Sequence, residues 1–352
     1  MKEISRRRAL AAVGTTGALA LAGCNAIELG SDEDGEDGED ESDEPVAEEE
    51  STDEPADDES PAVAEQPYAF ALSPNLFEGY QVRAYDGIQS YLDAELAPTE
   101  LATPDSQTAI AVGLHDGTFA FAETGTFVGA LAARNGDAEI ALQRRAYGGW
   151  TYAAEIVTRE DSDVQSLEYV PGSTVAFADP SSSSGSFVPL HALSEAGVDV
   201  GELPQENTDA SFDASFSSHA QAVQMVLDGD VDVACVGRFI TLADDGERLR
   251  NALQSLHTQA DIPRAPILTS PALDERSKLT NPANQGITTD EFVDAMLAAP
   301  ESAYHGEDEE PNTDDDLWFD DLRPTDADAY ELPLAVADTL DLTVEDVSDL
   351  AR

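Results

Sequence analysis

Residues 174–189 of the sequence read TVAFADPSSSSGSFVP, and this stretch indicates the class of fold. The apolar run 174–178 is typical of a buried strand, and residues 187–196 predict a helix that ends before Gly197. Four serines and a glycine join the two, so hydroxyl groups and the unpaired N–H groups of a helix start meet at one point. Because the helix dipole is positive there, the turn is suited to bind a phosphate-like anion. A serine-rich helix cap without a ligand is the alternative interpretation.

The chain from residue 67 onward alternates between strand-like and helix-like segments. Apolar runs predict strands at 68–72, 118–122, 140–143, 152–158 and 231–236, and periodic stretches predict helices at 82–96, 106–114, 289–298 and 332–340. A second polar turn, at Thr124 to Phe127, leads into a further predicted helix that runs through Arg134. This alternation is typical of an α/β fold with mostly parallel sheets flanked by helices.

The composition excludes several classes of partner. The chain of 352 residues has 73 acidic and 17 basic residues and a formal net charge of −56, and its lysines are Lys2 and Lys278. Binding to nucleic acid or to an anionic lipid surface depends on neutralising phosphates, so neither is expected. Acidic residues throughout the folded part indicate adaptation to high salt, which screens their repulsion, and therefore predict a haloarchaeal source.

Residues 1–24 are predicted to be a targeting segment outside the fold. Residues 5–10, SRRRAL, resemble a twin-arginine (Tat) export signal, and the apolar stretch 9–22 that follows is too short for a stable membrane span. Residues 21–24, LAGC, resemble a lipobox, so Cys24 is the predicted site of lipidation. The hypothesis places the protein at the extracellular face of the cell membrane, where the lipid anchor makes its only membrane contact.

Residues 25–66 are predicted to form an acidic, disordered tether, since they consist of Asp, Glu, Ser, Pro and Gly with almost nothing to bury. The only other cysteine, Cys235, lies in an apolar run and is expected to be a small core residue. Because no Cys/His cluster has the spacing of metal ligands, we expect no metal site and no cofactor.

Several segments together resemble one family. They are the lipoprotein leader, the stretch 175–189, Ser218-His219-Ala220, and residues 227–234, LDGDVDVA, with Ile262-Pro263 and Pro266-Ile267 beyond them. The chain is similar to the phosphate/phosphite/phosphonate-binding proteins of ABC importers, the PhnD-like group of type II periplasmic binding proteins. The resemblance implies an extracellular receptor that is not an enzyme, works as a monomer and delivers its ligand to a permease in the membrane.

The resemblance also implies the domain organisation. Two α/β lobes are expected, joined by two crossover strands, with the ligand in the cleft between them. The first lobe would comprise residues 67–156 and, with the C-terminal helices, 266–352, and the second lobe would comprise 157–265.

The site residues follow from matching the family's motifs to this sequence. The serine-rich turn that holds the phosphonate oxygens carries over to Ser182, Ser183, Ser184 and Gly185, the histidine at the start of the next helix to His219, and the tyrosine before the crossover to Tyr152. His219 could add a charge-assisted bond if protonated. We add Thr124 and Thr126, on the first-lobe turn, as candidates for the opposing donors.

The departures from the family pattern bear on the ligand. Relatives that bind aminoalkyl phosphonates hold the ammonium with carboxylates near the hinge, where this chain has Phe239 and Ala265. An unpaired buried ammonium would cost about 3 to 5 kcal/mol. We therefore expect phosphate, phosphite or a small alkylphosphonate. Arg238 either faces the cleft or, as we favour, is a solvent-exposed arginine.

Two other classes of function are open to the sequence. A serine hydrolase could use one of Ser182 to Ser184 with His219 as base and Asp232 or Asp179 as its orienting carboxylate. However, the Gly-x-Ser-x-Gly elbow is absent. A surface protein without a small ligand would use the serine turn only as a helix cap.

Overall fold

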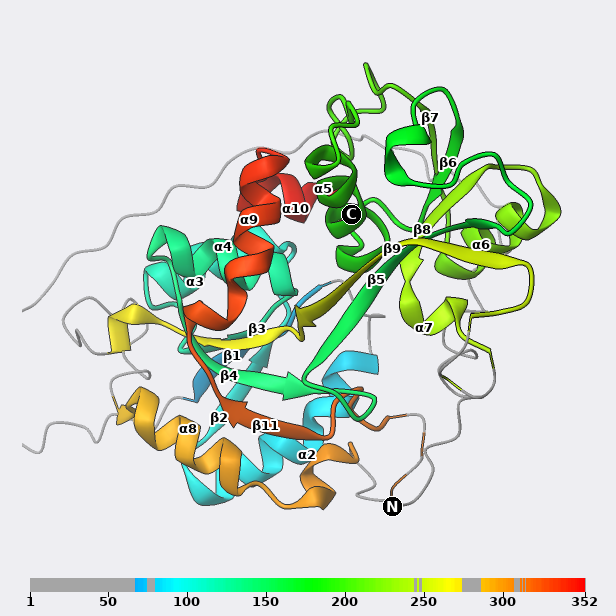
Figure 1. Ribbon diagram of the computed structural model, residues 1–352. Coiled ribbons are helices and arrows are strands. Elements are labelled where there is room, and N and C mark those ends of the chain that lie inside the picture. The colour runs from blue at the N-terminus through cyan, green and yellow to red at the C-terminus, as the bar shows by residue number, and fades with distance from the viewer. Residues whose placement is uncertain are drawn as a thin grey trace, which may run out of the picture. The chain divides into compact units, whose positions relative to one another are not determined.

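The structure is a computed structural model, and it describes residues 67–74, 80–243, 246, 249–273, 286–306, 311, 313 and 315–351. The predicted leader with Cys24 and the predicted tether lie outside the described residues. Eleven strands in these ranges form two sheets, and helices flank both of them (Figure 1). The predicted α/β fold is therefore confirmed. None of the described helices is long and apolar enough to cross a bilayer.

The first sheet has six strands. Their order is β11 (Asp321–Pro324), β4 (Glu139–Arg145), β10 (Pro266–Thr269), β3 (Phe121–Glu123), β1 (Tyr68–Ala71) and β2 (Thr99–Ala102). Phe70 and Phe121 point to one face, where α2 (Tyr80–Glu95) and α8 (Thr289–Ala298) cover them. Ala71 and Ala122 point to the other face, which α3 (Gln107–His115) and α4 (Thr126–Asn135) cover. The alternation along β1 and β3 thus builds two cores on one sheet.

The second sheet has five strands. Their order is β7 (Asp213–Phe216), β6 (Thr174–Phe177), β8 (Val233–Gly237), β5 (Thr151–Arg159) and β9 (Leu253–Pro263). Val175 and Phe177 contribute to a core with α5 (Val188–Glu195), and Ala176 contributes to another with α6 (His219–Asp228). Cys235 is fully buried in β8, which confirms it as a core residue.

The sheets are mixed, so the expectation of mostly parallel pairing is wrong. Four of the nine strand pairings are parallel and five are antiparallel among the described residues. Parallel neighbours such as β1 and β3 are joined through helices, as parallel pairing requires. The strands β5 and β10 instead arrive directly from the other sheet and run antiparallel to their neighbours.

The chain passes between the sheets at two adjacent places. It leaves the first sheet after Arg145, at the end of β4, and enters the second at Thr151, at the start of β5; it returns between Pro263 and Pro266. The strands β5 and β9 pair along most of their length, and Figure 1 shows them side by side. At the crossing, the Arg264 N–H donates to the Trp150 carbonyl over 3.0 Å. Both passages are therefore tied to each other.

The C-terminal helices α9 (Glu331–Thr339) and α10 (Val344–Leu350) follow β11 and pack on α4 and α3. Helix α9 also contacts α5 of the second sheet. The Thr339 hydroxyl lies 2.9 Å from His191 Nδ1, and the Gln205 side-chain amide donates to the Leu340 carbonyl over 3.0 Å. These helices join the two halves on the side away from α8.

Candidate functional site

The serine turn connects β6 to α5, as predicted, but through a tight π-helical turn at Ser183–Phe187. The Ser182 hydroxyl caps this turn and accepts the Gly185 N–H over 3.0 Å. Ser182 also holds the turn through its carbonyl, which accepts the N–H groups of Ser186 and Phe187. The first N–H groups of such a turn have no acceptor inside it and are available to a ligand.

Gly185 is required by close packing. A Cβ atom at this position would lie 2.2 Å from the Ala178 Cβ and 2.8 Å from His219 Cε1. We expect Gly185→Ala to lower the free energy of unfolding by about 1 to 3 kcal/mol, the usual cost of overpacking. Chemical denaturation measures this change. The matched control is Gly286→Ala, where an added Cβ meets nothing within 4 Å. Equal effects of the two substitutions would contradict this account.

His219 is the first residue of α6 and supports the serine turn. Its Nδ1 accepts the Gly237 N–H over 3.0 Å, and its Nε2 lies 3.3 Å from the Ser182 hydroxyl. Because Nδ1 accepts a bond, the proton of the neutral ring is on Nε2 and is donated to Ser182. Burial lowers the pKa of His219 to about 4, although Asp179 partly opposes the shift. The suggested charge-assisted bond from a protonated His219 is therefore not available near neutral pH.

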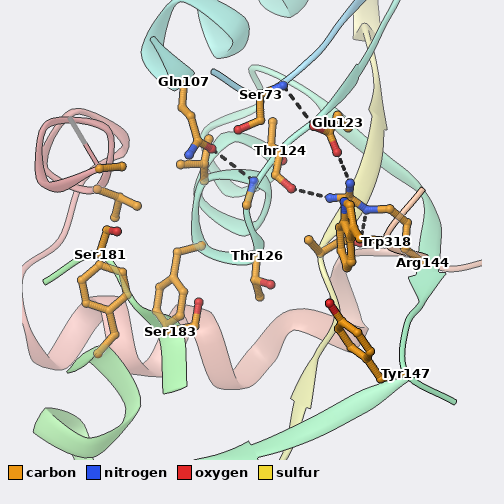
Figure 2. A pocket seen from close by; sticks show the side chains of 17 residues that line it. Ser73, Gln107, Glu123, Thr124, Thr126, Arg144, Tyr147, Ser181, Ser183 and Trp318 are labelled. Atoms are coloured by element: carbon orange, nitrogen blue, oxygen red, sulfur yellow. Dashed lines mark hydrogen bonds and ion pairs between the residues drawn. The ribbon is translucent and has the colours of Figure 1, made fainter. Parts of the chain in front are cut away.

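A cavity of about 400 Å³ lies beside the serine turn (Figure 2). One wall comes from the second sheet's half and contains Ser181, Ser183 and Phe187. The opposite wall comes from the first sheet's half and contains the start of α4. Of the predicted site residues, Ser183, Thr124 and Thr126 line this cavity. Those that do not line it are Ser182, Ser184, Gly185, His219 and Tyr152.

The start of α4 has no side-chain cap of its own. The Gln107 side-chain oxygen instead accepts the Gly125 N–H over 3.1 Å. The Thr126 hydroxyl donates to the Pro263 carbonyl over 3.2 Å, and thereby connects α4 to the crossing strand β9. The Thr124 hydroxyl is buried without a hydrogen-bond partner in the described structure. Of the two threonines, Thr124 thus has the free hydroxyl.

A buried ion pair forms the end of the cavity nearest the first sheet. The Arg144 guanidinium is paired with Glu123, and both side chains are 1% exposed. Arg144 also donates to the carbonyls of Thr124 (2.6 Å) and Ala265 (3.1 Å), and it lies 4.6 Å from the Trp318 ring centroid. The second oxygen of Glu123 accepts the Ser73 N–H over 3.2 Å. Sequence reasoning found neither member of this pair.

Tyr152 lies on β5 next to the serine turn, as predicted, with its hydroxyl within hydrogen-bonding reach of Ser183 and Ser184. Burial raises the pKa of Tyr152, and these contacts lower it only in part. The Arg264 guanidinium lies over the Tyr152 ring, 4.5 Å from the centroid. Sequence reasoning missed this cation beside the serine turn.

The two hinge positions, Phe239 and Ala265, lack a carboxylate, as the sequence indicates. Phe239 is exposed and its ring packs edge-on against His219, while Ala265 lines the cavity, so neither position offers a carboxylate. Arg238 pairs instead with the buried Glu155 over 2.9 Å. Glu155 also accepts the Thr241 hydroxyl over 2.6 Å. Arg238 therefore serves to neutralise a buried carboxylate of the second sheet, with its side chain 35% exposed.

A family model matches residues 70–330, and its description is "ABC transporter, phosphonate, periplasmic substrate-binding protein". The match covers most of the chain and both sheets. The chain belongs to this family of phosphonate-binding proteins. The protein is thus a substrate-binding component of an ABC transporter and not an enzyme. No curated protein matches the sequence.

Solved structures show the same fold as this binding protein. The Xanthomonas citri protein XAC2383 bound to ATP is 17% identical with a TM-score of 0.56, and the match covers 78% of this chain and 98% of that one. PhnD1 from Prochlorococcus marinus in complex with methylphosphonate is 14% identical with a TM-score of 0.50, covering 79% of this chain and 99% of that one. At these identities the likeness is one of fold.

The serine hydrolase alternative is wrong for this binding protein, and the geometry gives a physical reason. A general base must accept the serine proton, yet the His219 lone pair is already used by the Gly237 N–H. Asp179 accepts from Ser181 and Asp232 accepts from Thr174, so neither carboxylate orients His219.

Proposed function

We propose that this binding protein is a lipid-anchored receptor that takes up a phosphorus oxyanion in the cavity between its two sheets and delivers it to a membrane permease. The cavity supports this function, because the start of α4 and the serine turn meet it from opposite walls. Each start offers unpaired N–H groups and a positive dipole end. The hydroxyls of Ser183 and Thr124 add neutral donors, whereas the Ser181 hydroxyl already donates to Asp179.

The ligand we propose is phosphate, phosphite or a small alkylphosphonate. Glu123, the one carboxylate among the described residues that line the cavity, already accepts bonds from Arg144, Ser73 and Tyr85. An ammonium group would therefore have to compete with Arg144 for it. We infer that Ser182, Ser184, Gly185, His219 and Tyr152 position the donors, while Ser183, Thr124 and the α4 start contact the ligand.

Titration calorimetry of the full chain at high salt tests this function. The panel comprises phosphate, phosphite, methylphosphonate and 2-aminoethylphosphonate, with sulfate as the control. We expect at least one of the first three to bind and to raise the melting temperature, since a ligand of the folded state stabilises it by RT ln(1 + [L]/Kd). If none of the three binds, the proposed function is refuted, and the alternative of a surface protein that has no small ligand is favoured.

We further propose that Cys24 carries the lipid and that residues 25–66 hold the folded part, as a monomer, away from the membrane. Cys24→Ser is expected to release the protein into the medium, because a lipobox is modified only at its cysteine. Immunoblots of the membrane and medium fractions measure this. A matched substitution of the buried Cys235, Cys235→Ser, should leave the fractionation unchanged. Retention of the Cys24→Ser variant on the membrane would refute the anchor.

The acidic composition supports the proposal that the protein works in high salt, as in a haloarchaeal cell. The net charge of −56 destabilises the compact state by self-repulsion unless salt screens it.

A further inference from the structure

Arg264 follows β9 directly, where the chain crosses back to the first sheet. Its N–H donates to the Trp150 carbonyl over 3.0 Å, and its carbonyl accepts the Tyr330 hydroxyl over 2.8 Å. The backbone of Arg264 is thus fixed on both sides, and its side chain starts from a defined place beside the cavity residue Ala265.

The side chain of Arg264 is a largely buried cation without a carboxylate. Its Nε atom is buried and has no hydrogen-bond partner, and no ion pair involves Arg264 among the described residues. Other arginines in comparable surroundings are paired, Arg144 with Glu123 and Arg238 with Glu155. Burial of an unpaired charge is unfavourable, so the Arg264 guanidinium would be stabilised by an anion from outside the chain.

Two tyrosines hold the guanidinium. It lies 4.5 Å from the Tyr152 ring centroid and 5.4 Å from that of Tyr147. Cation–π contacts of this kind fix the plane of the cation but leave its N–H groups free to donate. The two rings, which we call the tyrosine clamp, therefore orient the Arg264 guanidinium without neutralising its charge.

Arg264 does not itself line the cavity, and the two tyrosines connect its guanidinium to residues that do. Tyr147 lines the cavity and is labelled there in Figure 2, and Tyr152 reaches Ser183 of the serine turn. Tyr147 has a φ of 52° because it is the first central residue of the two-residue turn that joins Ala146 to Gly149, and this turn fixes its backbone beside the crossing.

We propose that Arg264, clamped between Tyr147 and Tyr152, is the counter-ion of the bound phosphorus oxyanion and the residue that discriminates against phosphonates carrying an ammonium group. The inference rests on the proposed function of the cavity. It adds an unpaired positive charge to a site whose other lining charges, Arg144 and Glu123, are paired with each other. An anion gains a charge-assisted bond from Arg264, whereas an ammonium at the hinge meets a like charge.

Titration calorimetry of the full chain compares the wild type with Arg264→Gln and Arg264→Lys, using phosphate, phosphite, methylphosphonate and 2-aminoethylphosphonate. We expect Arg264→Gln to weaken binding of the best simple oxyanion by about 10- to 100-fold, as loss of one charged hydrogen bond implies. Arg264→Lys should recover part of this affinity. The ratio of affinities between methylphosphonate and 2-aminoethylphosphonate should fall by about tenfold in Arg264→Gln. The matched control is Arg134→Gln, which removes an exposed arginine of α4.

The melting temperature without ligand separates binding from folding. A structural role predicts that Arg264→Gln melts earlier, whereas our proposal predicts an unchanged or higher melting temperature, because no buried carboxylate is left unpaired. If the wild type binds none of the phosphorus oxyanions, the proposed function fails. If the wild type binds one and Arg264→Gln binds it equally well, the role of Arg264 alone is refuted.

Discussion

Glu123→Gln is expected to lower the free energy of unfolding by about 3 to 5 kcal/mol. The substitution keeps the shape of the side chain but removes the charge opposite Arg144, and both residues are 1% exposed. Arg144 would then be a buried cation with only carbonyl oxygens around it. Urea denaturation of the ligand-free protein at a fixed high salt concentration measures the change.

The matched control for Glu123→Gln is Asp338→Asn. Asp338 pairs with Arg134 over 2.6 Å, but the two side chains are 71% and 37% exposed. Exposed pairs contribute about 0 to 1 kcal/mol, so this variant should unfold nearly as the wild type does. If Glu123→Gln and Asp338→Asn lowered the free energy of unfolding by the same small amount, the Glu123–Arg144 pair would not stabilise the fold as we expect.

The stability of the protein is expected to depend on His219 in weakly acidic solution. An unfolded histidine has a pKa of about 6.5, whereas burial lowers the pKa of His219 to about 4. Above pH ~6.5 both states are neutral and the residue contributes no pH dependence. As the pH falls from there toward 4, the unfolded chain binds a proton that the folded chain does not, so stability is lost.

The size of this effect follows from the same shift. At about 1.4 kcal/mol per pKa unit the full loss would be roughly 3 kcal/mol, and we expect about 2 kcal/mol because the ring keeps some contact with solvent. The comparison is the free energy of unfolding of the wild type and of His219→Asn at pH 7 and pH 4.5. Asparagine can still accept the Gly237 N–H, and the titration of all other groups cancels in the difference. Parallel pH curves for the two proteins would show that His219 does not titrate as described.

The sequence predicts the elements around the site well, because they follow local rules. The serine turn is bounded by a buried apolar run and a helix that begins with Val188 and Pro189, and these signals need no tertiary information. The strand β9 is the main segment that was missed. Its residues are mostly half-exposed or exposed, so the sequence 253–263 lacks the alternation that predicts a strand.

The charged residues of the site could not be found in the same way. Leu142 and Arg144 are two apart in β4 and share a face of the sheet, which was a usable sign that Arg144 is buried. Its partner Glu123 is on β3, and β10 lies between the two strands. This arrangement depends on how the chain returns from the second sheet. Arg264 depends on the same crossing, since Tyr147 and Tyr152 meet there only after the sheets have formed.

The fully buried Cys235 can report how often the second sheet opens by local unfolding. Cys24 aside, the chain contains no other cysteine, and burial raises the pKa of the Cys235 thiol, so a thiol-reactive dye cannot label it while the second sheet is intact. The labelling rate therefore counts how often the strands around β8 separate. A ligand that binds only the intact protein must lower the rate at which Cys235 is labelled, whatever the chemistry of the ligand.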